Sequence, residues 1–144
     1  MAAVVRLLKI PPFYRDLLIA IGDEGELNKG LTKFLGKEKA DEVTGKLEIL
    51  DTSRGKTYIN TKDNIFFVWL PELPNDNERF GFLIHELFHA TVAALNSIGA
   101  IPSDDSEEVY AYVLGYLTER MLTEFNASIS FGREPASKHS QPKS

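Results

Sequence analysis

Residues 65–89 read IFFVWLPELPNDNERFGFLIHELFH, and a change of hydrophobic pattern within this stretch decides the fold. Ile65–Leu70 is rich in β-branched and aromatic residues and predicts a strand, which Pro71 and Pro74 end. The apolar residues that follow recur three and four positions apart, which predicts an amphipathic helix. The chain is therefore expected to pack a helix against a sheet.

The limits of this helix follow from capping residues. Asn75 is a good N-cap, and Glu78 three positions later fits the reciprocal capping pattern. Gly99 is a natural stop, and Pro102 confirms the break. The apolar stripe predicted to face the core consists of Phe80, Leu83, Ile84, Leu87, Phe88, Thr91, Leu95 and Ile98.

Beside that stripe the helix carries the pentapeptide His85-Glu86-Leu87-Phe88-His89. Residues four apart on a helix lie on one face, so both imidazoles are expected to point at the same spot. Two imidazoles from consecutive turns can chelate zinc, and Glu86 can reach a water molecule that the metal holds. The pentapeptide uses two of the three histidines in the chain, and the third is His139.

Composition bounds the class of protein. The 144 residues are 43% hydrophobic and 26% charged, which is ordinary for one globular domain, expected over residues 1–128. Residues 129–144 are expected to form a disordered tail. A net charge of −5 without a basic stripe argues against nucleic acid, and the absence of cysteine excludes disulfides and thiolate metal sites. Neither a signal peptide nor a membrane span is recognisable, so a cytoplasmic location is expected.

The remaining segments predict an α+β fold. A short apolar run at 13–22 favours a buried strand, although its leucine content leaves a helix open. Helical spacing is found at 26–35 and again at 37–43. Residues 47–50, a turn, the strand 56–60 and then Ile65–Leu70 predict an antiparallel meander. We therefore expect a small, mostly antiparallel sheet packed on helices.

The third ligand of a catalytic zinc has to come from elsewhere in the chain. Glu107 and Glu108 begin the next predicted helix, for which Asp104 is a good N-cap with Glu107 closing its cap. This arrangement would leave Glu108 to bind metal, and Ala111 and Gly115 on its face would let the two helices approach closely. Glu107 remains the alternative ligand.

The pattern His85-Glu86-x-x-His89, then 18 residues, then Glu108, resembles the gluzincin metallopeptidases, which include thermolysin and the zinc aminopeptidases. The segment EEVYAY at 107–112 is similar to the aminopeptidase segment Asn-Glu-Gly-Phe-Ala, in which the glutamate binds zinc. Glu107 departs from that pattern by replacing its asparagine. The small size resembles minimal single-domain gluzincins. The runs HELFHAT and DDSEEVYAYVLGYLTE are also similar to small proteins encoded in phages and prophages, which would place the protein in a host cytoplasm.

The resemblance implies a zincin-like fold, with an active-site helix and a second helix that carries a ligand. It implies one Zn²⁺ per chain, bound by His85, His89 and Glu108, and Glu86 as the general base of peptide hydrolysis.

It also implies two further features of the site. Family members use a Tyr or His to stabilise the oxyanion, and Tyr112 is the best local candidate, one turn beyond Glu108. An extended peptide substrate would pair with an edge strand beside the helix, here Ile65–Leu70.

Two other functions remain open from the sequence. A phage-encoded protein without activity could use the same ligands for a structural zinc, with Asp104 or Asp105 as a fourth ligand. A regulatory protease like the ImmA/IrrE group is the other, although that group usually carries a DNA-binding module, which is not recognisable here. The sequence favours a zinc metallopeptidase that acts on a peptide or protein.

Overall fold

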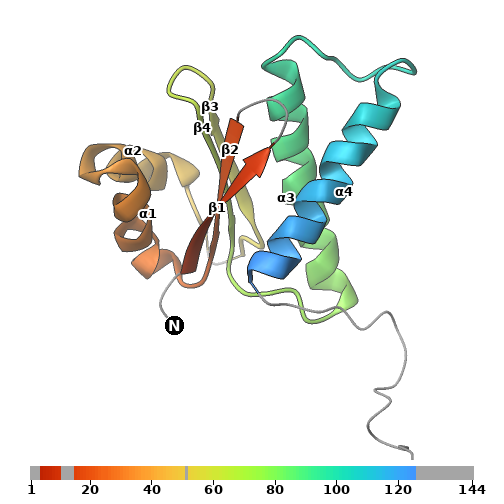
Figure 1. Cartoon of the computed structure of the whole chain (residues 1–144). Coiled ribbons are helices and arrows are strands. Elements are labelled where there is room, and N and C mark those ends of the chain that lie inside the picture. The colour runs from red at the N-terminus through yellow and green to blue at the C-terminus, as the bar shows by residue number, and fades with distance from the viewer. Residues whose placement is uncertain (1–3, 11–14, 51, 126–144) are drawn as a thin grey trace, which may run out of the picture.

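The computed structural model describes residues 4–10, 15–50 and 52–125, which form a four-stranded mixed sheet with α-helices on both faces (Figure 1). The tail predicted at 129–144 lies outside the described residues. The elements in chain order are β1 (Val4–Ile10), β2 (Arg15–Ile21), the 3-10 turn η1 (Glu24–Glu26), α1 (Leu27–Leu35), α2 (Lys37–Leu47), β3 (Lys56–Asn60), β4 (Ile65–Leu70), α3 (Asn77–Asn96) and α4 (Glu107–Glu124).

The strand order of the sheet is β1-β2-β4-β3. The pairs β1–β2 and β4–β3 are antiparallel, whereas β2 and β4 are parallel. The α+β class and the strands at β2, β3 and β4 are confirmed, but the antiparallel meander is wrong. Leu47 still belongs to α2, which ends at Glu48 in a left-handed conformation (φ 51°), so 47–50 adds no strand before β3.

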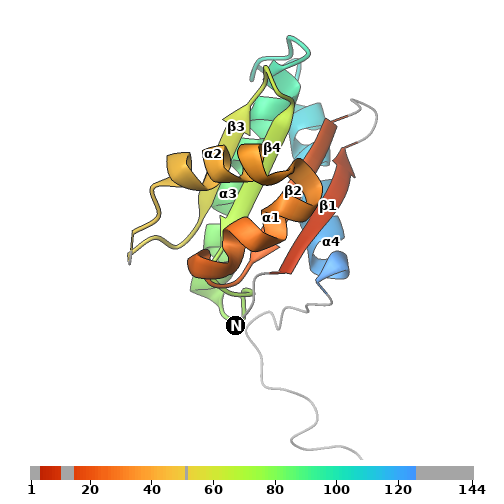
Figure 2. The same cartoon turned by 90° about the vertical axis from the view of Figure 1, so that its left-hand side faces the viewer.

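The central strand β4 divides the interior into two cores. All six of its residues are buried, and alternate side chains point to opposite faces of the sheet. Phe66 packs into the core under α3 and α4, whereas Phe67 packs into the core under α1 and α2. Figure 2 shows α1 and α2 lying across their face of the sheet. A strand covered on both faces reads as a continuous apolar run, which is why its sequence predicts it so clearly.

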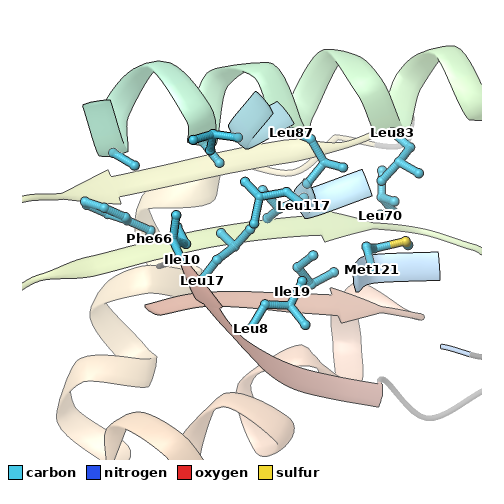
Figure 3. Close-up of a cluster of buried hydrophobic side chains, with 14 of the residues drawn as sticks. Leu8, Ile10, Leu17, Ile19, Phe66, Leu70, Leu83, Leu87, Leu117 and Met121 are labelled. Atoms are coloured by element: carbon cyan, nitrogen blue, oxygen red, sulfur yellow. The ribbon is translucent and has the colours of Figure 1, made fainter. Parts of the chain in front are cut away.

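Helix α3 begins one residue later than the sequence predicts. Asp76, rather than Asn75, is the N-cap, and its Oδ1 accepts a hydrogen bond of 2.8 Å from the backbone N–H of Arg79. The predicted stripe is buried at Leu83, Leu87, Thr91 and Leu95, whereas Phe88 and Ile98 are nearly half exposed and Ala90 and Ala94 are buried instead. Figure 3 shows Leu83 and Leu87 pointing toward the sheet, with Leu117 and Met121 of α4 in the same cluster.

Helix α4 runs antiparallel beside α3 (Figure 1). Its N-cap is Ser106 and not Asp104, so the predicted cap closed by Glu107 is wrong. The hydroxyl of Ser106 donates to the carbonyl of Ile101 and accepts from the N–H of Ser103, and this turn sets the start of the helix. Among the residues that the structure describes, no helix has the length and apolarity needed to cross a membrane.

Candidate metal centre and adjoining groove

The two histidines of α3 converge on one point. Their Nε2 atoms lie 3.2 Å apart, and the ring planes are nearly perpendicular, at 85°. A tetrahedral ion with Zn–N bonds of 2.0–2.1 Å would hold two nitrogens about 3.3–3.4 Å apart. The pair therefore has the spacing of a zinc chelate. The same distance also allows a hydrogen bond between a protonated and an unprotonated ring nitrogen.

Glu86 lies beside this pair and is buried, with a relative exposure of 8%. Its Oε1 accepts a hydrogen bond of 2.5 Å from the hydroxyl of Thr57 in β3, and its Oε2 is 3.9 Å from His85 Nε2. A buried carboxylate is costly unless it is hydrogen-bonded, so the Thr57 hydroxyl supplies a partner that this position needs. One oxygen of Glu86 is thus held by a hydrogen bond from β3, while the other lies near His85.

A glycine allows the sheet to come this close to Glu86. A Cβ atom added at Gly55, just before β3, would lie 2.9 Å from Glu86 Cγ and 3.1 Å from Leu70 Cδ2. A side chain at position 55 would therefore displace Glu86. The sequence does not identify Gly55 or Thr57 as site residues, because a strand about 30 residues away gives no local signal of contact with the helix.

The predicted third ligand is not brought to the histidines in this structure. Glu108 is exposed in the first turn of α4. Two residues later, the hydroxyl of Tyr110 donates to Asn96 Oδ1 at 3.3 Å and to the carbonyl of Ala100 at 2.8 Å. The start of α4 thus lies beside the end of α3, and Asn96 is about 10 Å along the helix axis from His89.

The other predicted ligands also lie away from the histidines. Within residues 4–10, 15–50 and 52–125, no three His, Asp or Glu side chains lie close enough to share an ion. Glu107, Asp104 and Asp105 therefore do not join the histidines either. The histidine pair fits two of the three protein ligands of a catalytic zinc, and the described residues do not complete the set.

Tyr112 is 68% exposed on α4 and does not line the cavities beside the histidines. The structure therefore does not bring the candidate oxyanion donor to Glu86.

The edge strand beside the motif is β3 and not β4. The predicted edge strand Ile65–Leu70 is paired on both sides, by β2 and β3, so that part of the prediction is wrong. β3 and α3 together line a cavity of about 1140 Å³, which contains the histidine pair and the apolar side chains of Ile59, Phe88 and Val92. A strand edge thus runs beside the candidate metal centre.

The chain has no match among the known proteins with which it was compared. No protein-family model matches the chain, and neither a curated protein nor a solved structure does. The likeness to gluzincins therefore rests on the motif residues, and the site has to be judged by its own geometry.

Proposed function

We propose that the protein is a zinc-dependent metallopeptidase in which His85 and His89 hold the ion. The observation that carries this proposal is the convergence of the two Nε2 atoms, 3.2 Å apart, beside a buried glutamate whose second oxygen lies 3.9 Å from His85 Nε2. The two histidines are exposed to a large cavity rather than closed over by other side chains. An open position is what distinguishes a catalytic zinc from a structural one.

Glu86 is the general base in this proposal. Bound zinc would lower the pKa of a water molecule and polarise the substrate carbonyl. Glu86 Oε2 takes a proton from the attacking water and passes it to the leaving amine, while Thr57 holds Oε1. The C–N bond of the peptide breaks, and the oxygen of water forms the new C–O bond. The edge of β3 would hold the substrate in an extended conformation through backbone hydrogen bonds.

The third ligand is proposed from the sequence pattern alone. Glu108 occupies the position of the zinc-binding glutamate in the gluzincin pattern, and Glu107 is its neighbour in the same exposed helical turn. Zinc affinity of Glu108→Ala and of Glu107→Ala separates the two, because only the ligand variant should lose more than about tenfold in affinity. If both variants bound zinc with the affinity of wild type, neither carboxylate would be a ligand of the ion.

Zinc content and peptide hydrolysis, measured on the same preparations, test the function. Wild type should bind one zinc ion and hydrolyse peptides. His85→Ala should lose the metal, whereas Glu86→Gln should keep it and lose about 10²–10⁴-fold in rate. A wild-type protein that binds no zinc would refute the proposal. Bound zinc without hydrolysis would support a structural metal site instead.

A further inference from the structure

Three adjoining cavities follow α3 along one side. The first, of about 590 Å³, lies at the start of the helix and shares Arg54, Glu78 and Phe82 with a middle cavity of about 480 Å³. The middle cavity in turn shares Gly55, His85 and Glu86 with the cavity beside β3. Neighbouring cavities therefore adjoin through shared lining residues, and we call the row of three the α3 groove. His85 lines both the middle cavity and the cavity beside β3, whereas His89 lines only the latter of these two.

The groove is long enough to hold a chain on both sides of the histidines. The α3 residues that line it begin at Glu78, and the last lining residue is Ser97 just beyond the helix. At a rise of 1.5 Å per residue this span is about 28 Å, the length of about eight residues of extended chain. His85 lies about 10 Å from one end and about 18 Å from the other, which leaves room for about three and about five residues.

We propose that the α3 groove binds an internal segment of an extended polypeptide, so that the enzyme is an endopeptidase. This inference rests on the proposed function. An enzyme that removes terminal residues needs a site closed on one side of the metal, but here cavities extend from His85 in both directions. The edge of β3 along the longer arm identifies the occupant as an extended chain, since a strand edge presents unpaired backbone groups.

The two arms of the groove differ in chemistry. The longer arm carries the apolar side chains of Ile59, Phe88 and Val92 beside the charged Lys56, whereas the shorter arm carries the charged side chains of Arg54 and Glu78 beside the apolar Phe82. An apolar residue of the substrate would therefore be accommodated on the longer arm. The substrate class is an unfolded or loop segment with apolar side chains on one side of the bond that is cut.

Binding by the Glu86→Gln variant separates recognition from hydrolysis. Fluorescent ten-residue peptides with apolar residues are prepared either with both ends blocked or with free ends, and affinity is measured by anisotropy. The two forms should bind alike, and four-residue versions should bind more weakly because they fill only part of the groove. Wild type loaded with zinc should cut the blocked peptide at an internal bond, which mass spectrometry locates.

A matched pair of variants tests the location of the binding site. Phe88 in the longer arm and Phe34 on α1, on the other face of the sheet, are 45% and 46% exposed. In the Glu86→Gln background, Phe88→Asp should weaken peptide binding more than about tenfold, because it places a charge on the apolar arm. Phe34→Asp should leave binding unchanged, and thermal unfolding of both variants verifies that they fold.

The outcomes distinguish the inference from the function on which it rests. Binding or cleavage that requires a free chain end would overturn the internal-segment inference and leave a metallopeptidase. Equal effects of Phe88→Asp and Phe34→Asp would also overturn it. If Glu86→Gln binds blocked peptides but wild type with zinc cuts none, the result supports peptide binding in the α3 groove and overturns the proposed function.

Discussion

The two faces of the sheet use their polar side chains differently. On the α1/α2 face, Asn28 Nδ2 donates to Asp41 Oδ1 at 2.9 Å, and Lys39 Nζ lies 2.7 Å from Asp63 Oδ2, so these groups link one element to another. On the α3 face, Thr57 donates a hydrogen bond to one oxygen of Glu86, and His85 and His89 line the groove. Polar groups thus connect elements on both faces, but on the second face two exposed histidines also line a large cavity.

The largest expected effect tests whether the two faces are equally well packed. Phe66 and Phe67 are neighbours in β4, 1% and 0% exposed, and they point into opposite cores. Phe66→Ala and Phe67→Ala should each lower the free energy of unfolding by about 3–5 kcal/mol, because each leaves a large cavity. Urea unfolding measures both. A much smaller loss for one variant would show that its core repacks.

The next largest effect distinguishes two glycines, one that lies against Glu86 and one with open space around it. Gly55→Ala brings a Cβ into contact with Glu86 and should lower kcat about 100-fold, the effect expected for a misplacement of about 1 Å. Gly45→Ala, within α2 where a Cβ meets nothing within 4 Å, should leave activity unchanged and stabilise the fold by about 0.5–1 kcal/mol. Steady-state kinetics and unfolding check both variants. Unchanged activity in Gly55→Ala would show that Glu86 tolerates displacement.

A smaller effect on activity is expected from Thr57. Thr57→Val keeps the shape but removes the donor to Glu86 Oε1, so kcat should fall by about tenfold while KM stays constant. Thr57→Ser retains the hydroxyl and should restore kcat. A loss that Ser does not restore would indicate that the methyl group matters and not the hydrogen bond. A change confined to KM would mean that Thr57 contacts the substrate instead.

The sequence predicts most elements of the fold because their patterns are local. The apolar run of β4 and the helical spacing of α3 are both found in the structure as predicted. The sequence does not predict β1, because Arg6 and Lys9 interrupt its apolar residues and its partner β2 supplies the pairing. The parallel contact of β2 with β4 joins segments almost 50 residues apart, and no local pattern specifies such a pairing.

For the site, the sequence predicts what a single helix can determine. Spacing of four residues brings His85 and His89 together, and this is confirmed. Thr57 reaches Glu86 only through the sheet, so its role depends on packing between distant segments. The cap predicted at Asp104, which would leave Glu108 free to bind metal, is not found, because Ser106 caps α4 instead. Neighbouring residues with similar capping propensity cannot be ranked from sequence, as Asn75 and Asp76 also demonstrate.

The smallest expected effect concerns the carboxylates of the α1/α2 face. A hydrogen bond from Lys39 holds the pKa of Asp63 below its usual value, and one from Lys37 lowers the pKa of Asp41. A folded-state pKa below the unfolded value stabilises the fold above the unfolded pKa, near 3.8, and this contribution is lost as pH falls further. The pKa of Lys39 is raised by the same contact with Asp63, so its contribution is lost only as pH rises above about 10.5.

Asp63→Asn should therefore lower the urea midpoint slightly at neutral pH and have a smaller effect near pH 2, because protonation of Asp63 as the pH falls removes its charge. Glu119→Gln, at an exposed position on α4, is the control and should show no such difference between the two pH values. The effect should be small because the pair is solvent-exposed, and it should decrease with added salt. If Asp63→Asn destabilised the protein equally at both pH values, the Lys39–Asp63 contact would act through geometry rather than charge.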